Sequence, residues 1–239
     1  MIELKNCDIG YDSVLLKGVS LTIEPGKCYG IVGKSGVGKS TLLNFISGIE
    51  ASNARINLFN GSITSVSDIR AAVVFQNGDQ LFPWQTVLKN IMLSHYKDTK
   101  KEPKFQAVEK AKKLLDEVEL TGYGDRFPHE LSGGMKQRAA MARALYSSPD
   151  ILILDEPLSS LDEETRSRLR RLIKKVIEKH RCTVIMVTHQ FEDAVYLTDT
   201  ILAVKEDGHI KELKLDNKED SCVSINKIRD HLYEKADTT

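Results

Sequence analysis

The sequence predicts an α/β fold in which helices cover a largely parallel sheet, with an antiparallel β layer and an inserted helical subdomain. Short apolar runs of strand length alternate with helical patterns, which is typical of a parallel sheet with helical crossovers. These runs lack alternating polar residues, as expected for strands buried on both faces. Early in the chain, apolar and polar residues do alternate, which predicts antiparallel strands with one solvated face. The alternating apolar residues are Ile2, Leu4, Leu21 and Ile23.

Five buried strands are predicted, at residues 28–32, 71–75, 151–154, 183–187 and 200–204. From residue 85 to 146 the pattern is helical, with an apolar stripe formed by Ala107, Val108, Ala111, Leu114, Leu115 and Val118. We therefore expect a single domain over residues 1–239, with an α/β lobe at approximately 1–84 and 147–210 and a helical subdomain at approximately 85–146. Residues 211–239 form a C-terminal tail. The sequence predicts a turn just before it, at residues 206–208, and a short helix within it, near Ile228.

The composition excludes several classes of protein. Hydrophobic residues make up 41% and charged residues 28% of the 239 residues, which is typical of a globular protein. Lys plus Arg and Asp plus Glu each total 34, so no net charge favours nucleic acid or anionic lipid. No apolar run approaches the roughly 20 residues that a spanning helix needs. The four cysteines lack Cys-x-x-Cys spacing, which argues against a metal or redox site.

A phosphate-binding loop follows the predicted strand at 28–32. Residues 33–41 match the pattern G-x-x-x-x-G-K-[ST] and precede a helical run. Gly36 and Gly38 let backbone N–H groups approach phosphate oxygens, Lys39 would lie between the β- and γ-phosphates, and the Ser40 hydroxyl can bind Mg²⁺. The predicted nucleotide-binding residues of the loop are Gly33, Lys34, Ser35, Gly36, Val37, Gly38, Lys39, Ser40 and Thr41. The loop indicates a P-loop NTPase (RecA-like) core, and by itself it fits a GTPase or a small-metabolite kinase equally well.

Two further motifs narrow the class. The strand at 151–154 ends in adjacent carboxylates, of which Asp155 suits a Mg²⁺ site and Glu156 could orient or deprotonate an attacking water. Ser132 is a suitable N-cap for a helix running through Arg143, and the glycines that follow leave backbone N–H groups bare. A second anion-binding helix start suggests a site completed by another subunit.

With these motifs in order, the chain resembles the nucleotide-binding subunits of ABC transporters over essentially its whole length. Residues 132–134 look like the family's signature, which we call the signature turn, and Gln76 matches its Q-loop. Residues 159–162, which include Asp162, resemble its D-loop, and His189 resembles its switch histidine. Tyr11 stands where the family places an aromatic ring against adenine.

The resemblance implies ATP and Mg²⁺ as cofactors and a head-to-tail pair of ATPase subunits, either a homodimer or a pseudo-dimer. The expected catalytic residues are Glu156, His189 and Gln76, and the expected Mg²⁺ ligands are Ser40, Gln76 and Asp155. ATP of the other subunit would contact Ser132, Gly133, Gly134 and Gln137. The family also implies a separate transmembrane permease, an extracytoplasmic solute-binding protein and a peripheral location on the cytoplasmic face of the membrane. No nucleic acid is expected.

The segment after the Q-loop indicates a branch of the family. Residues 81–84, which end in Pro83 and Trp84, look like the nitrate, sulfonate and taurine importers. Trp84 could anchor a membrane subunit or pack within the helical subdomain. Residues 52–61 lack a Pro-x-x-Gly turn common in the family, and Gln190 stands where many members have Asp. The alternatives are a stand-alone ATPase of an exporter and an ABC ATPase without a transport role.

Overall fold

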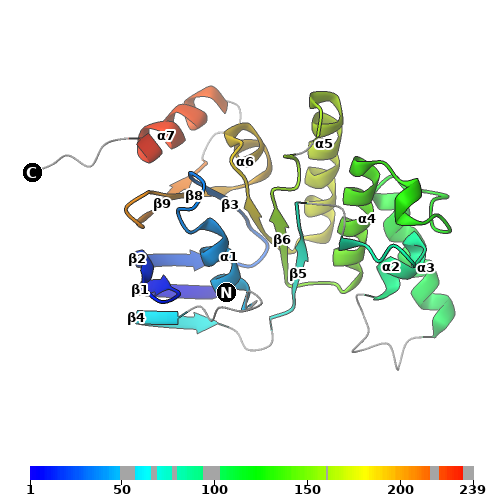
Figure 1. Ribbon diagram of the computed structural model, residues 1–239, viewed down its shortest axis with the longest axis horizontal. Coiled ribbons are helices and arrows are strands. Elements are labelled where there is room, and N and C mark those ends of the chain that lie inside the picture. Colours follow the sequence, from blue (N-terminus) through cyan, green and yellow to red (C-terminus); the bar gives the residue numbers. More distant parts are fainter. Residues whose placement is uncertain are drawn as a thin grey trace, which may run out of the picture. The chain divides into compact units, whose positions relative to one another are not determined.

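The computed structural model describes residues 1–48, 57–65, 69–76, 80–93, 103–159, 161–215 and 221–233. The chain divides into two compact units (Figure 1). One unit comprises residues 1–69 and 183–239, and the other comprises residues 70–182. The expected boundaries of the helical subdomain at 85 and 146 stay a prediction. The lysine-rich residues 97–104, which the sequence indicates as a solvated link between helices, lie mostly outside the described residues.

An antiparallel layer opens the first unit. It has the strand order β2-β1-β4, with β1 (Ile2–Gly10), β2 (Val14–Ile23) and β4 (Asn57–Ser65). Ile2 pairs with Ile23 and Leu4 with Leu21, and all four side chains are buried. The alternation in the sequence therefore predicted both the layer and its buried face.

Parallel strands form the centre of the first unit. The strand order β7-β3-β8-β9 is built from β3 (Cys28–Val32), β7 (Thr183–Val187), β8 (Thr200–Val204) and β9 (Ile210–Lys214). Every residue of β3, β7 and β8 is buried, which confirms the three predicted strands. β9 returns antiparallel to β8 through the predicted turn, which Lys205 N closes by donating to the His209 carbonyl at 2.9 Å.

Three helices pack on these strands. They are α1 (Lys39–Ser47), α6 (Phe191–Leu197) and α7 (Ser221–Tyr233). α1 contacts β1 and β7, α6 contacts β3, and α7 contacts α6 and β8 (Figure 1). Ile228 of α7 is fully buried, which confirms the helix predicted near it.

The second unit combines one parallel strand pair with most of the helices. Its elements are β5 (Ala71–Val74), α2 (Val87–Met92), α3 (Lys104–Glu117), the short 3₁₀ helix η3 (Pro128–Glu130), α4 (Gly133–Tyr146), β6 (Ile151–Asp155) and α5 (Glu163–His180). β5 and β6 pair in parallel, with Ala71 opposite Ile151. β5 ends one residue earlier than predicted, because the Phe75 carbonyl accepts a hydrogen bond from the Gln137 side chain and its ring is 52% exposed.

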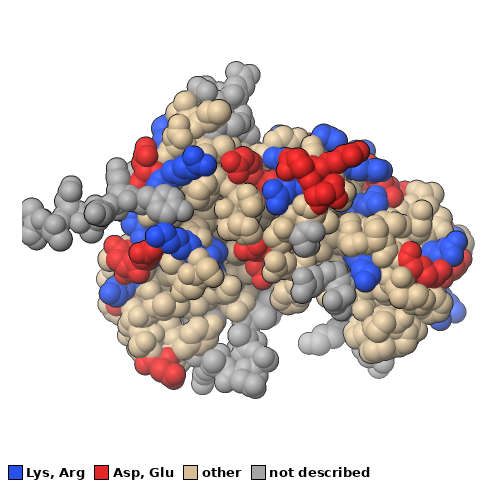
Figure 2. All heavy atoms as spheres, turned by 45° about the horizontal axis from the view of Figure 1, so that its top comes forward, with Lys and Arg blue, Asp and Glu red and all other residues tan. Residues whose placement is uncertain are grey.

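Apolar helix faces build the core of the second unit. The predicted stripe is largely buried, at Ala107, Ala111, Leu114, Leu115 and Val118. It packs with α4, which also contacts α2, β5 and α5. No helix in the described ranges is both long and apolar enough to cross a bilayer. Basic and acidic side chains are interspersed on the face drawn in Figure 2.

Asn90 organises the turn that precedes α2. It is fully buried, and its Oδ1 accepts from the Phe82 N–H at 2.7 Å. Its Nδ2 donates to the carbonyls of Phe82, Gln85 and Thr86 at 3.0–3.1 Å. One side chain therefore satisfies four backbone groups of the turn that carries Trp84. Because buried polar groups without partners are costly, this turn depends on Asn90.

We expect Asn90→Ala to lower the free energy of unfolding by about 2 to 4 kcal/mol, since it leaves several buried backbone groups without partners. Urea denaturation followed by far-UV circular dichroism measures this change. Lys89→Ala, an exposed change in the same helix, should stay within about 0.5 kcal/mol of the unmodified protein. Equal stability of the two variants would contradict the role of Asn90.

Candidate functional site

The phosphate-binding loop lies between β3 and α1 of the first unit. α1 begins at Lys39, within the motif itself, and Gly38 is its N-cap. Gly36 and Gly38 have left-handed φ angles of 81° and 105°, which residues with a Cβ atom rarely adopt. A Cβ atom on Gly36 would extend into open space, so the surface of the loop is accessible to a ligand there. This bare backbone at a helix start fits a phosphate group.

Lys39 folds its side chain back over the loop. Its Nζ donates to the carbonyls of Lys34 at 2.7 Å and Gly33 at 3.0 Å. The ammonium is therefore held at the loop, where it can exchange carbonyl partners for phosphate oxygens. Ser40 is exposed beside it, whereas Thr41 is buried.

Neighbouring segments of the first unit fix the shape of the loop. A Cβ atom on Gly33 would lie 2.6 Å from the Val204 carbonyl, and one on Gly38 would lie 2.9 Å from Leu16. Lys34 forms an ion pair with Glu206 of the β8–β9 turn, with 2.5 Å between Nζ and Oε1. Close packing and this ion pair therefore link the loop to the end of β8.

His189 and the phosphate-binding loop leave the sheet at the same edge. Ile31 of β3 pairs in parallel with Val187 of β7, so Gly33 and His189 each follow two residues later. The Thr188 N–H donates to the Ile31 carbonyl at 3.2 Å, which extends the pairing to the residue before His189. The His189 side chain is exposed. Parallel strands thus bring the predicted switch histidine close to the loop in the fold.

Tyr11 lies in the short connection from β1 to β2. Its side chain is half-buried, and its carbonyl accepts from Asn57 Nδ2 at 2.7 Å. The structure therefore anchors the backbone of this residue to β4. Its contact with adenine stays a prediction.

The second unit repeats this arrangement with carboxylates and an amide. Val74 pairs in parallel with Leu154, so Gln76 and Glu156 also leave their strands at one edge. Gln76 Nε2 donates to Ser159 Oγ at 3.0 Å, and that hydroxyl donates to the Glu156 carbonyl at 3.1 Å. The Q-loop glutamine is thereby connected to the turn that carries the predicted base.

Glu156 has a left-handed φ of 45°, in a turn closed by the Ser159 N–H. A non-glycine residue in this conformation is strained, and such strain is common at functional sites. Asp155, the last residue of β6, is half-buried beside it. The turn therefore presents two adjacent carboxylates from a constrained backbone.

The signature turn starts α4. Ser132 is the N-cap of the helix, and its Oγ accepts from the Met135 N–H at 3.3 Å, which confirms the predicted cap. A Cβ atom on Gly133 would meet no other atom within 4 Å, so this turn leaves backbone open to a ligand. Gln137 is only 3% exposed and donates to the Phe75 carbonyl at 3.2 Å. Its contact with a nucleotide stays a prediction, and its burial points instead to a packing role.

Asp162 of the D-loop caps α5. Its Oδ1 accepts from the Thr165 N–H at 2.9 Å, and this hydrogen bond lowers the pKa of its carboxyl group. The charged carboxylate also interacts favourably with the helix N-terminus. Ser160, in the same loop, lies outside the described residues.

The predicted site residues are thus divided between the two units. Tyr11, His189 and the phosphate-binding loop belong to the first unit, and the signature turn and the carboxylates belong to the second. The candidate Mg²⁺ ligands supply hydroxyl, amide and carboxylate oxygens, which are the hard ligands that Mg²⁺ prefers. Among the described residues, no cluster of three or more His, Cys, Asp and Glu side chains could hold a metal.

Sequence reasoning missed several residues that shape these loops. Glu206 pairs with Lys34 across 172 positions of the chain, and Asn90 fixes the turn before α2. Glu119 joins Arg138 of α4 to Arg168 of α5. No motif predicts the contacts of these side chains, and a single sequence gives no signal that pairs Glu206 with Lys34 or Glu119 with Arg168.

Comparisons with known proteins agree with these motifs. Residues 16–159 match the family described as "ABC transporter". The protein named "Aliphatic sulfonates import ATP-binding protein SsuB 1" of Rhodococcus jostii is 38% identical over 204 residues, covering 85% of this chain and 78% of that protein. SsuB 2 of Burkholderia lata is 34% identical and covers 95% of this chain and 85% of its own length.

Solved structures show the same fold. The dimeric ATP-binding cassette MJ0796, in a post-hydrolysis state with ADP and Pi, is 30% identical with a TM-score of 0.73, covering 91% of this chain and 100% of that one. CbiO1 of Clostridium perfringens, part of an ABC transporter complex, is 27% identical with a TM-score of 0.77. The match covers 97% of this chain and 94% of that one. Motifs, fold and relatives agree, and the chain belongs to the ABC transporter family as an ATP-binding protein.

Proposed function

We propose that this chain is the ATP-hydrolysing subunit of an importer for a small organic solute of the aliphatic sulfonate type. The phosphate-binding loop carries the proposal, because its left-handed glycines and its helix start share a sheet edge with His189. The relatives named as sulfonate import proteins support the class of solute. The subunit would act at the cytoplasmic face of the membrane as a peripheral protein.

In the first unit, the loop binds the phosphates of ATP through its backbone N–H groups. Lys39 releases the carbonyls of Gly33 and Lys34 and bridges the β- and γ-phosphates, since a charged oxygen is the stronger acceptor. Tyr11 stacks on adenine. His189 contacts the γ-phosphate and distinguishes ATP from ADP.

In the second unit, Glu156 accepts a proton from the attacking water. Its left-handed backbone and the hydrogen bonds from Ser159 to its carbonyl constrain the turn from which this carboxylate projects. Gln76 contacts the same water, and its hydrogen bond to Ser159 connects the Q-loop to the turn that carries Glu156. Ser40, Gln76 and Asp155 are suited to hold Mg²⁺, which neutralises phosphate charge when it is bound.

Two subunits complete the site head to tail. The signature turn offers Ser132 and the bare N–H groups of Gly133 and Gly134 to the γ-phosphate bound by the other subunit. The dimeric cassette among the solved structures supports this arrangement. Closure requires the γ-phosphate, so hydrolysis and phosphate release reopen the pair.

A separate permease would bind near the turn before α2. Trp84 is 69% exposed there, and its ring centroid is 5.3 Å from that of Phe82. The Arg143 guanidinium lies 4.9 Å from the Phe82 ring centroid, and Arg143 donates to the Gln80 carbonyl. The exposed Trp84 ring therefore rests on packed side chains. This exposure favours the anchor over the packing alternative for Trp84. A solute-binding protein would deliver the solute to the permease.

We expect Gly38→Ala to weaken ATP binding by about tenfold or more, because alanine at a φ of 105° costs roughly 1 to 2 kcal/mol and crowds Leu15 and Leu16. Equilibrium titration with a fluorescent ATP analogue measures the affinity. Gly48→Ala is the matched control, since Gly48 is also left-handed and a Cβ atom there meets open space. Equal affinities of the two variants would argue against the role of the loop.

We expect Glu156→Gln to lower ATP turnover by about 10² to 10⁴, the range for loss of a general base, without loss of ATP binding. The variant should accumulate as an ATP-bound dimer, which light scattering detects. Glu109→Gln, a change of a half-buried carboxylate on α3 far from the motifs in sequence, serves as the control. Turnover near the unmodified rate in Glu156→Gln would remove Glu156 from the base role.

Copurification tests the transport role. A tagged chain, extracted from host membranes in mild detergent, should bring down a polytopic membrane protein identified by mass spectrometry. Disrupting the gene for this chain should abolish uptake of an alkanesulfonate, and the unmodified gene should restore uptake while the Glu156→Gln form does not. Recovery of soluble proteins or nucleic acid alone would leave the ATPase chemistry in place and overturn the importer assignment.

A further inference from the structure

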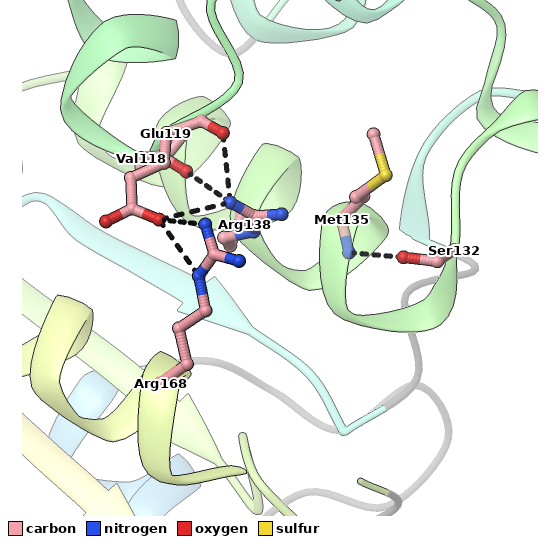
Figure 3. Close-up of polar contacts among 6 residues, drawn as sticks. All are labelled: Val118, Glu119, Ser132, Met135, Arg138 and Arg168. Carbon is pink, nitrogen blue, oxygen red and sulfur yellow. Dashed lines mark hydrogen bonds and ion pairs between the residues drawn. The ribbon is translucent and has the colours of Figure 1, made fainter. Parts of the chain in front are cut away.

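Glu119 lies beside the two helices that begin at the signature turn and at the D-loop. It follows Val118, the C-cap of α3, and its backbone has a left-handed φ of 55°. This conformation is unfavourable for a residue with a Cβ atom and persists where surrounding contacts compensate for it. Arg138 of α4 and Arg168 of α5 supply such contacts (Figure 3).

Arg138 closes the C-terminal end of α3. Its Nη1 donates to the carbonyls of Glu119 at 2.9 Å and Val118 at 3.3 Å, and lies 3.7 Å from the Glu119 carboxylate. Cations are favourable at helix C-termini because the last carbonyls are negatively polarised. The Arg138 side chain is only 16% exposed, and burial lowers its pKa. A buried guanidinium requires these acceptors, so α4 is held against the end of α3.

Arg168 approaches the same carboxylate from α5. Its Nη2 and Nε lie 2.8 Å and 3.2 Å from Glu119 Oε2, and the side-chain hydrogen bond from Arg168 lowers the pKa of Glu119. Glu117, two residues earlier, contacts the far end of α5, where Lys179 Nζ is at 2.7 Å and His180 Nε2 at 2.8 Å. The end of α3 therefore contacts α5 near both of its ends.

A second contact joins α4 and α5 one turn earlier. A Cβ atom on Gly134 would lie 3.1 Å from Thr165 Cγ2, so the first turns of the two helices almost touch. Arg138 comes four residues after Gly134, and Arg168 comes three residues after Thr165, so each pair shares one side of its helix. Thr165 is also the residue whose N–H Asp162 caps. Signature turn and D-loop are thus connected at two successive helical turns.

We propose that Glu119 is a positioning residue for ATP hydrolysis, which holds the signature turn and the D-loop together as one piece. The inference rests on the proposed function, in which the signature turn of one subunit binds ATP held by the other. The signature turn and the D-loop then meet the opposite subunit with their relative positions already fixed. Closure of the dimer on ATP therefore does not have to order each of them separately. Glu119 touches no nucleotide in this arrangement. Its loss therefore lowers dimer closure and turnover and leaves ATP binding to the phosphate-binding loop unchanged.

Glu119→Ala in the full chain tests the proposal. Alanine and glutamate both carry a Cβ atom and adopt a left-handed backbone at similar cost, so the change isolates the carboxylate. Turnover at saturating ATP should fall about three- to tenfold, with an unchanged dissociation constant for ATP. In the Glu156→Gln background, the ATP concentration needed for the dimer should rise by a similar factor. Arg168→Ala should have the same effect, and the double variant should lose no more than either single one.

Two variants separate positioning from stability. Glu109→Ala removes a carboxylate from within α3, which pairs with Lys112 on the same helix, and should leave turnover unchanged. Glu119→Gly removes the carboxylate and relieves the left-handed strain, so it should resist urea at least as well as Glu119→Ala and still show the loss. If Glu119→Gly shows normal ATP turnover, the lower turnover of Glu119→Ala comes from backbone strain and not from the missing carboxylate. That result would overturn the proposal.

The remaining outcomes distinguish this inference from the function on which it rests. If Glu156→Gln dimerises with ATP, and adding Ser132→Arg to it prevents dimerisation, the ATP site shared between two subunits is supported. Normal turnover and closure in Glu119→Ala and Arg168→Ala would then overturn the positioning role alone. If Glu156→Gln forms no dimer in ATP, the shared site is wrong and the positioning role is overturned with it.

Discussion

The hydrogen bonds between parallel strands determine which side chains can meet in this protein, because they bring the carboxyl ends of neighbouring strands to one edge. In the first unit, the pairing of Ile31 with Val187 leads the phosphate-binding loop and His189 out of the sheet together. In the second unit, the pairing of Val74 with Leu154 does the same for Gln76 and Glu156. A slip of one residue in either pair would turn its side chains to the opposite face and separate these groups. The burial of β3, β7 and β8 on both faces makes such a slip costly.

Left-handed backbone strain occurs in two turns of this chain that the function requires to keep one conformation. Among the described residues, five that are not glycine have a positive φ, and two of them are Glu156 and Glu119. Ser159 donates to the carbonyl of Glu156, and two arginines surround the carboxylate of Glu119. In both cases hydrogen bonds compensate for an unfavourable backbone. The result is a turn that cannot relax without losing those partners.

The sequence predicted local features well because their causes are local. Apolar runs located β3, β7 and β8, alternation predicted the antiparallel layer that includes Ile2 and Ile23, and Ser132 was recognised as a helix cap. The end of β5 was placed one residue too late, because Gln137 takes the Phe75 carbonyl from another part of the chain. Pairs such as Lys34 with Glu206 depend on which distant loops the fold brings together. Periodicity and motif spacing contain no information of that kind.

The exposure of Trp84 has a spectroscopic consequence. It is the single tryptophan of the 239 residues, so the intrinsic indole fluorescence of the chain comes from one turn. At 69% exposure the ring is already in water, and unfolding of the chain changes its surroundings little. The emission is therefore a poor indicator of global stability. A surface that covers the ring would instead exclude water from it and move the emission to shorter wavelength, so the chain carries its own optical reporter for contacts at the turn before α2.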